Sequence, residues 1–283
     1  MLADQLVKRH VSLTSWDCQF SDAGSKPSRN ALGRKQLRQA GSAATAADGC
    51  DLVISAVTAA QDLDAARSVL RSMKSGAWFL DLNSVAPGTR QSVADVVQNV
   101  GGRYVEAAIM SPIRPDGIAS PVLIGGPHAR KFIPLASRLG FTGMTFCSER
   151  IGPASATKMC RSVVVKGMES LLVESLLAAR YHGVDEAVLA SLDNLLPHED
   201  WPRQARYMMS RTLEHGGRRA EEMREAALTV AEAGIEGRMS EACAHSQAQA
   251  AKLVQAVEKQ QLPAMLDAML VILSRTATEP QTG

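Results

Sequence analysis

The fold is decided by the stretch DLVISAVTAAQDLDAARSVLRSMKSGAWFLDLN, residues Asp51–Asn83. Its two ends, DLVISAV and AWFLDL, are short apolar runs of the kind that form buried strands. Between them, residues 62–73 carry apolar side chains at helical spacing, and a basic segment ending in glycine predicts the stop of a helix. A strand, a helix and a second strand in this order predict a βαβ unit with a parallel sheet.

The same alternation continues on both sides of this stretch. Residues 11–17 are predicted to form a strand after a short helix, and a helix over 89–102 leads into a strand over 103–109. After residue 150 the strands stop, and a long apolar helix over 158–183 is followed by helices that proline or glycine interrupts, with one break at Gly216–Gly217. We therefore predict an α/β Rossmann-like domain over residues 1–149 and an all-α domain over residues 150–283.

One feature of a dinucleotide-binding domain is missing from the 283 residues. Such a domain opens with a central strand and a G-x-G-x-x-G loop, whose backbone N–H groups hold the pyrophosphate. No such motif precedes Asp51. We therefore expect an incomplete sheet that lacks its first strand. Either the start of the chain has been placed too far downstream, or the domain is truncated.

Composition excludes several classes of protein. A net charge of +2 and 4% aromatic residues argue against a nucleic-acid-binding protein, which usually has a concentrated basic face. The five cysteines are scattered without metal-ligand spacing, so we expect no metal site and reduced thiols in the cytoplasm. No apolar run reaches about 18 residues, so no membrane-spanning segment is predicted.

Four strings, taken in order, resemble one family. They are DLVISAVT (Asp51–Thr58), DLNSVAPGT (Asp81–Thr89), IGPASATKMCRS (Ile151–Ser162) and DWPRQARYMMSRTLEHGGRRAEEMREAA (Asp200–Ala227). The second resembles a D-x-S-T-x-x-P-x-T segment, and the third has a glycine six residues before a lysine. Over roughly residues 2–275 the chain resembles the β-hydroxyacid dehydrogenases, which are related to 3-hydroxyisobutyrate and 6-phosphogluconate dehydrogenases. It is most similar to a poorly characterised branch with its own helical C-terminal domain.

The resemblance implies an NAD(P)-dependent oxidoreductase. Hydride would pass between a nicotinamide and a small hydroxy acid, or a related carbonyl or imine substrate. The residues that the resemblance assigns to cofactor contacts are Val57, Thr58, Asn83 and Ser84.

The resemblance also assigns a catalytic general acid and base to Lys158. The positive end of a helix dipole and burial both disfavour a cation, so a lysine there releases its proton more easily. It would take a proton from an alcohol as hydride leaves the carbon, or return it in the reductive direction. The alternative is an exposed lysine with no chemical role.

Two serines are candidate substrate contacts. Ser162 lies one helical turn after Lys158, where the family usually has asparagine, and its hydroxyl would bind a substrate oxygen. Ser111 lies in EAAIMSP, which matches the family's D-A-P-V-S-G-G segment with Met110 at the serine position. The substrates of characterised relatives therefore do not transfer directly to this chain.

Asp17 ends the strand over residues 11–17. An acidic residue at this position of a dinucleotide-binding domain binds the ribose hydroxyls and favours NAD over NADP. An ordinary strand-end aspartate is the equally open alternative.

The long helix over residues 158–183 is too apolar for a solvated surface element, so we expect a homodimer. The second functional interpretation is a catalytically impaired or inactive truncated homologue that acts as a dimeric scaffold.

Overall fold

A computed structural model describes residues 2–34, 37–113, 115–192 and 198–278, with side chains described to Arg275. The chain divides into two compact units, Met1–Met159 and Cys160–Gly283. The first is an α/β unit and the second is helical. None of the helices in the described ranges is long and apolar enough to span a membrane.

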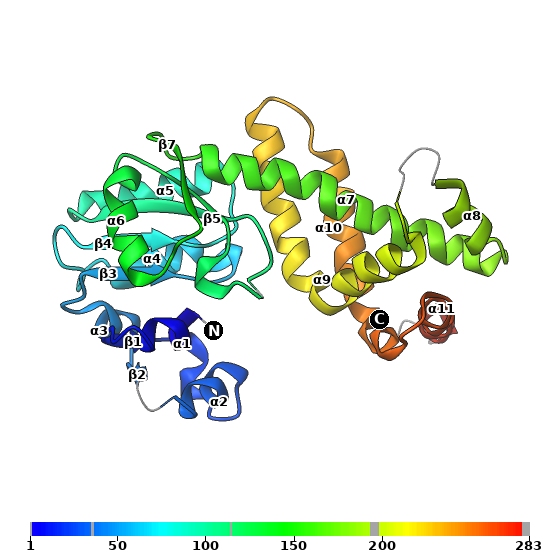
Figure 1. The fold of residues 1–283 in the computed structure, drawn as a ribbon, viewed down its shortest axis with the longest axis horizontal. Coiled ribbons are helices and arrows are strands. Elements are labelled where there is room, and N and C mark those ends of the chain that lie inside the picture. Colours follow the sequence, from blue (N-terminus) through cyan, green and yellow to red (C-terminus); the bar gives the residue numbers. More distant parts are fainter. Residues whose placement is uncertain (1, 35–36, 114, 193–197, 279–283) are drawn as a thin grey trace. The chain divides into compact units, whose positions relative to one another are not determined.

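The α/β unit contains a five-stranded sheet in the order β3-β4-β5-β6-β7 (Figure 1). Its strands are β3 (Leu52–Ser55), β4 (Trp78–Asp81), β5 (Arg103–Ile109), β6 (Val122–Gly125) and β7 (Met144–Ser148). All neighbouring pairs are parallel except β5 and β6, which are antiparallel. The βαβ unit predicted from residues 51–83 is confirmed, and the parallel pairing brings the carboxyl ends of β3 and β4 to the same edge of the sheet.

A separate two-stranded parallel sheet precedes these strands. It consists of β1 (Leu13–Ser15) and β2 (Leu37–Gln39). Among the described strands, neither β1 nor β2 is hydrogen-bonded to the five-stranded sheet. Both β1 and β3 end their sheets, so each has one edge without a partner strand in the described ranges. The described strands of the α/β unit therefore form two separate sheets.

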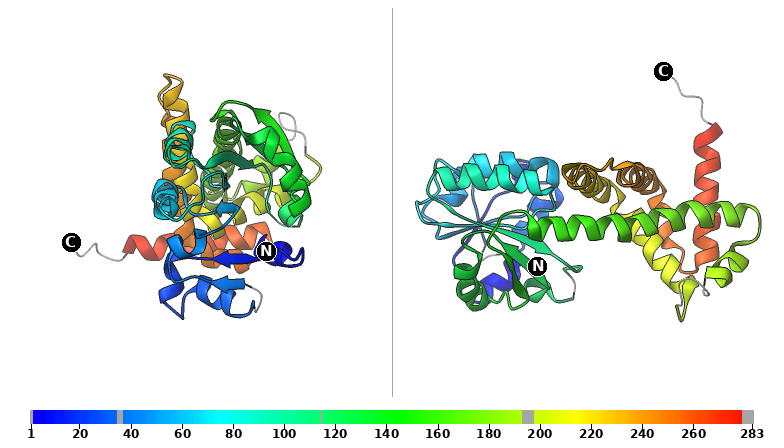
Figure 2. Two further views of the ribbon diagram at one scale, coloured as in Figure 1. Left: turned by 90° about the vertical axis from the view of Figure 1, so that its left-hand side faces the viewer. Right: turned by 90° about the horizontal axis from the view of Figure 1, so that it is seen from above.

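Helices cover both faces of the larger sheet, as the right-hand view of Figure 2 shows for α4 and α5 on one face and α6 on the other. The helices of this unit are α1 (Leu2–Val7), α2 (Lys26–Leu32), α3 (Ala43–Ala47), α4 (Asp62–Val69), α5 (Pro87–Asn99) and α6 (Ala129–Leu139). Alternate residues of β4 supply the two cores: Phe79 packs with α3, α4 and α5, whereas Leu80 packs with α1 and α6. Both side chains are buried, as a strand covered on two faces requires.

The second unit contains helices only, apart from its connecting turns. Its elements are the larger part of α7 (Pro153–Tyr181), then α8 (Asp185–Leu192), α9 (Trp201–Glu232), α10 (Arg238–Ala250), the 3₁₀ segment η4 (Ala251–Glu258) and α11 (Leu262–Thr278). Helices α9 and α10 lie side by side (Figures 1 and 2). The apolar core joins residues of α7, α9 and α11, including Leu176, Met209 and Met265.

The break predicted at Gly216–Gly217 is wrong, because α9 runs without interruption from Trp201 to Glu232. Packing explains why glycine occurs inside this helix. A Cβ atom on Gly216 would come within 2.2 Å of the backbone oxygen of Gln247 in α10. Gly216 therefore permits the close approach of α9 and α10, and it does not end the helix.

Candidate active site

Two loops meet at the carboxyl edge of the larger sheet. Ser55 at the end of β3 is aligned with Asp81 at the end of β4, so the segments that follow leave the sheet together. The first loop exposes Val57 and Thr58, and the second contains Asn83 and Ser84. Ligands of open α/β sheets bind at this edge. The four residues assigned to cofactor contacts lie in the two loops that follow β3 and β4 at this edge.

Asn83 joins the two loops through its side-chain amide. Its Oδ1 accepts a hydrogen bond from the backbone N–H of Val57 at 2.6 Å, and its Nδ2 donates to Ser55 Oγ at 2.9 Å and to Asp62 Oδ1 at 2.7 Å. The side chain is only 2% exposed. The amide of Asn83 is therefore committed to holding the loop, and it acts on a bound molecule through the position of Val57.

Behind Asn83 lies a buried group of charges. Arg90 of α5 pairs with Asp81, whose Oδ1 lies 2.6 Å from Arg90 Nη1 and whose Oδ2 accepts from the hydroxyl of Tyr104 at 2.8 Å. Asp62, the first residue of α4, is fully buried beside them. Burial and, after it, the neighbouring Asp81 carboxylate together raise the pKa of Asp62 to about 7, against the opposing effects of Arg90 and the Asn83 hydrogen bond.

The start of α7 is fixed by Glu106, a buried residue of β5. Its Oε2 accepts from the N–H of Gly152 at 2.7 Å, and its Oε1 accepts from the N–H of Ala154 at 2.8 Å. Burial raises the pKa of Glu106, although these two hydrogen bonds favour the carboxylate. Gly152 has a φ of +112°, which suits glycine at this turn. Glu106 thus satisfies two N–H groups that a helix start leaves without intrahelical partners.

This anchoring places Lys158 beside the second loop. Its Nζ donates to the hydroxyl oxygen of Ser84 at 2.5 Å, and the lysine is half-buried. One turn earlier, the Ser155 hydroxyl donates to the backbone oxygen of Val85. The helix start and the loop after β4 are therefore joined at two points, and an amine that can exchange a proton lies next to the predicted cofactor-binding residues.

The other predicted site residues lie on other elements. Asp17 follows β1 in the smaller sheet, and its Oδ1 accepts from the N–H of Gln19 at 2.9 Å at the start of a 3₁₀ turn. Ser111 follows β5, half-buried, and donates to the backbone oxygen of Pro112 at 3.2 Å. Ser162 is buried in the helical unit, 3.5 Å from Lys166 Nζ.

The helical unit contains its own buried charges around Ser162. Lys166 pairs with Glu222, and Arg219 pairs with Glu169 at 2.6 Å between Nη2 and Oε2. Burial lowers the pKa of Lys166, although Glu222 opposes this shift. These pairs connect α7 with α9, each cation facing a carboxylate of the other helix.

Several of these residues were missed by reasoning from the sequence. Asp81 and Glu106 carried a usable signal, since a charged residue inside an apolar strand must find a partner when buried. Asp62 and Arg90 carried none, because acidic residues are common in the first turn of a helix and Arg90 falls in a polar stretch.

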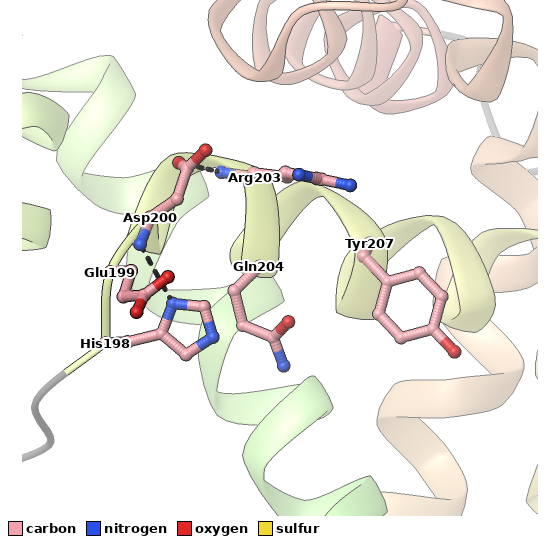
Figure 3. Close-up of a pocket in the computed structure, with 6 residues that line it drawn as sticks. All are labelled: His198, Glu199, Asp200, Arg203, Gln204 and Tyr207. Atoms are coloured by element: carbon pink, nitrogen blue, oxygen red, sulfur yellow. Dashed lines mark hydrogen bonds between the residues drawn. The ribbon is translucent and has the colours of Figure 1, made fainter.

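The helical unit has a surface depression of its own, which is formed by other residues than the candidate active site. It lies at the start of α9, where Asp200 N–H donates to His198 Nδ1 at 3.1 Å and Arg203 N–H donates to Asp200 Oδ1 at 3.0 Å (Figure 3). The second of these bonds is the N-cap of α9, in which Asp200 accepts from the first turn of the helix. Within the described ranges, no three His, Cys, Asp or Glu side chains are grouped to hold a metal ion.

Comparisons with known proteins agree with this architecture. A domain of unknown function, DUF1932, matches residues 179–250 of the helical unit. A conserved hypothetical protein from Sinorhizobium meliloti 1021 is 30% identical, with 94% of this chain and 91% of that chain covered and a TM-score of 0.68. MTH1747, a conserved protein of unknown function described as structurally similar to 3-hydroxyacid dehydrogenases, is 29% identical, with coverages of 88% and 91% and a TM-score of 0.65.

More distant structures share the fold alone. One is a Mycobacterium tuberculosis 3-hydroxyisobutyrate dehydrogenase with L-serine, which is 15% identical, with 95% of this chain and 94% of that chain covered and a TM-score of 0.67. Another is a Myxococcus stipitatus imine reductase in complex with NADP⁺, which is 16% identical, with 95% of each chain covered and a TM-score of 0.52. An uncharacterised 28.5 kDa protein from Methanothermus fervidus is 27% identical over 143 residues; the match spans 50% of this chain and 53% of that protein.

A Rossmann-like α/β unit followed by a helical unit defines the fold class of a 3-hydroxyacid dehydrogenase-like protein. The chain belongs to the β-hydroxyacid dehydrogenase and 6-phosphogluconate dehydrogenase-like superfamily, and its helical unit contains the DUF1932 domain.

Proposed function

We propose that the protein is an NAD(P)-dependent oxidoreductase with Lys158 as its general acid and base. The observation that carries this proposal is the 2.5 Å contact between Lys158 Nζ and Ser84 Oγ at the carboxyl edge of the sheet. A lysine in this position can pass a proton to a substrate oxygen or nitrogen that takes the place of the serine hydroxyl.

The loops after β3 and β4 fit the nicotinamide half of a dinucleotide. Val57 and Thr58 are exposed on the first loop, and Asn83 fixes the position of Val57. When bound, a nicotinamide supplies the acceptor or donor of hydride. The protein residues orient the reacting groups, and Lys158 holds or releases the proton that balances hydride transfer.

Finer features of the site belong to the same proposal. Asp17 keeps one carboxylate oxygen on the Gln19 N–H, and the other is assigned to ribose hydroxyls, with NAD slightly favoured over NADP. Ser111 and Ser162 are assigned to the substrate, a small hydroxy acid or a related carbonyl or imine.

A homodimer is part of this proposal. Helix α7 exposes Val164, Leu171 and Tyr181, which lie outside the apolar core of the helical unit. Burial of this surface against a second copy would remove apolar area from water. The five cysteines are free, which is typical of a reducing compartment such as the cytoplasm. Sedimentation of the purified protein tests the dimer, and a monomer at all concentrations would contradict it.

Replacement of the catalytic amine tests the proposed reaction. We expect Lys158→Ala to lower kcat at least about 100-fold, the usual contribution of general acid–base catalysis, while NADPH binding followed by fluorescence is retained. Lys131→Ala, which removes an exposed lysine of α6, is the matched control and should retain the wild-type rate. Retained turnover in Lys158→Ala would contradict the role of the lysine.

The separation of β1 and β2 from the five-stranded sheet favours a second candidate, an inactive homologue that acts as a dimeric scaffold. Fluorescence titration of the folded chain with NADH and NADPH separates the two. Saturable binding supports the oxidoreductase. A folded dimer without saturable binding up to about millimolar cofactor, where the binding free energy is only about −4 kcal/mol, supports the scaffold.

A further inference from the structure

Three groups form a continuous hydrogen-bonded series from the interior of the α/β unit to the exposed loop. Asp62 Oδ1 accepts from Asn83 Nδ2 at 2.7 Å, and Asn83 Oδ1 accepts from the Val57 N–H at 2.6 Å. Asp62 is fully buried and Asn83 is 2% exposed, whereas Val57 is 41% exposed. The position of the loop at its surface end is therefore set by a carboxyl group at its buried end.

The charges around Asp62 do not balance if every carboxyl group is ionised. Among the described side chains, the cation that faces the group is Arg90, and it already pairs with Asp81 at 2.6 Å. Tyr104 donates its hydroxyl to Asp81, so it brings no positive charge. An ionised Asp62 would add an uncompensated negative charge to a site from which water is excluded, and such a charge is costly.

The second oxygen of Asp62 shows where the missing proton belongs. Among the described side chains, no donor makes a hydrogen bond to Asp62 Oδ2, which is fully shielded from solvent. A buried carboxylate oxygen without a donor is rare. A proton on Oδ2 converts this atom into a donor towards Asp81 and leaves Oδ1 free to accept from Asn83. It also makes the group formed by Asp62, Asp81 and Arg90 electrically neutral.

We propose that Asp62 is a positioning residue that carries a proton at neutral pH and thereby holds Asn83, and through it the N–H of Val57, in place. As the pH rises, this proton passes to solvent, the buried site gains a negative charge, and the loop loosens. The raised pKa of Asp62 agrees with this geometry. The effect on a cofactor, though not the effect on the loop, rests on the proposed function.

Asp62→Asn tests the proposal directly, because asparagine has the shape and the donor–acceptor pattern of a protonated aspartic acid. The control is Asp64→Asn in the same helix, where the aspartate side chain is 74% exposed. The first readout is the protection of the Val57 amide in hydrogen exchange, corrected for the intrinsic pH dependence of exchange. It reports local opening of the loop and requires no cofactor.

In the wild type and in Asp64→Asn, we expect the protection factor of Val57 to fall about tenfold or more between about pH 6 and about pH 8.5. In Asp62→Asn, it should stay constant within about twofold over the same range. A wild-type protection factor that does not change with pH would overturn the proposal. So would an Asp62→Asn variant that loses protection in the same way as the wild type.

A second measurement on the wild type keeps the proposal testable if Asp62→Asn fails to fold. The ¹³C chemical shift of the Asp62 carboxyl carbon should titrate near neutral pH. A midpoint near pH 4, the ordinary range of aspartate and about three pH units lower than expected, would overturn the proposal. The affinity for NADPH, measured over the same pH range, tests whether the change in the loop also changes cofactor binding. If loop protection behaves as expected but no variant binds NADPH at any pH, the proposed function fails and the role of Asp62 in positioning the loop stands.

Discussion

In the α/β unit, the buried carboxyl groups of Asp62 and Asp81 lie beside the buried guanidinium of Arg90. In the helical unit, the buried cations Lys166 and Arg219 each face a carboxylate of the other helix, Glu222 and Glu169. In the first unit the charged side chains also bind backbone groups, since Arg90 donates to the backbone oxygens of Asp81 and Ala107. They therefore fix the loops at the edge of a sheet. In the second unit, the buried cations Lys166 and Arg219 instead bind carboxylate side chains of another helix.

The two arrangements differ in their response to pH. The raised pKa of Asp62 means that the folded state binds more protons than the unfolded chain between about pH 4 and pH 7, so this group's contribution to stability falls as the pH rises. The lowered pKa of Lys166 has the opposite sign, because the folded state releases its proton at a lower pH than the unfolded chain. Its contribution therefore rises with pH in the alkaline range.

The largest effect is expected when the Arg90 guanidinium is removed from the buried group in the α/β unit. Arg90→Leu leaves Asp81 buried without its partner and releases the loops that Arg90 holds, so we expect a loss of about 3–5 kcal/mol in the free energy of unfolding. Urea denaturation measures it. Arg67→Leu is the control, because the Arg67 side chain is 58% exposed and its pair with Asp64 contributes at most about 1 kcal/mol. Equal losses in both variants would contradict the special role of the buried group.

A smaller loss is expected when a pair in the helical unit is broken. Glu222→Leu leaves the Lys166 amine buried and should cost about 3 kcal/mol, since the amine reduces the penalty by releasing its proton. The double variant Lys166→Met/Glu222→Leu should recover most of this loss, because an apolar pair replaces the ion pair. Glu174→Leu at an exposed position of α7 is the control. A double variant no more stable than Glu222→Leu would show that the pair is not the source of the loss.

The smallest expected effect concerns the packing that brings α9 and α10 together. Gly216→Ala places a methyl group against the backbone of α10 and should destabilise the fold by about 1–3 kcal/mol. Gly217→Ala is the neighbouring control, since a Cβ there meets no atom within 4 Å, and it should stabilise α9 by about 0.5–1 kcal/mol. Thermal unfolding of the two variants should therefore shift in opposite directions, and shifts of the same sign would contradict the packing argument.

Part of the candidate site could be predicted from the sequence. The strand ends at Ser55 and Asp81 follow from two apolar runs, and parallel pairing then brings the loops after them to one edge. Lys158 could be singled out only through the resemblance of residues 151–162 to the family segment that has a glycine six residues before a lysine. The role of Asn83 could not, because its burial and its three partners depend on strands and a helix that are adjacent only in the folded chain.

The sequence by itself determined most of the strands and helices after residue 50, their order, and the change from an α/β to a helical unit, because hydrophobic periodicity acts over a few residues. Only the tertiary structure decided that α9 continues through Gly216 and that Asp62, Asp81 and Arg90 share one buried site. The physical reason is that the cost of burying a charge, and the space left for a side chain, depend on atoms from distant parts of the chain. Local patterns do not contain that information.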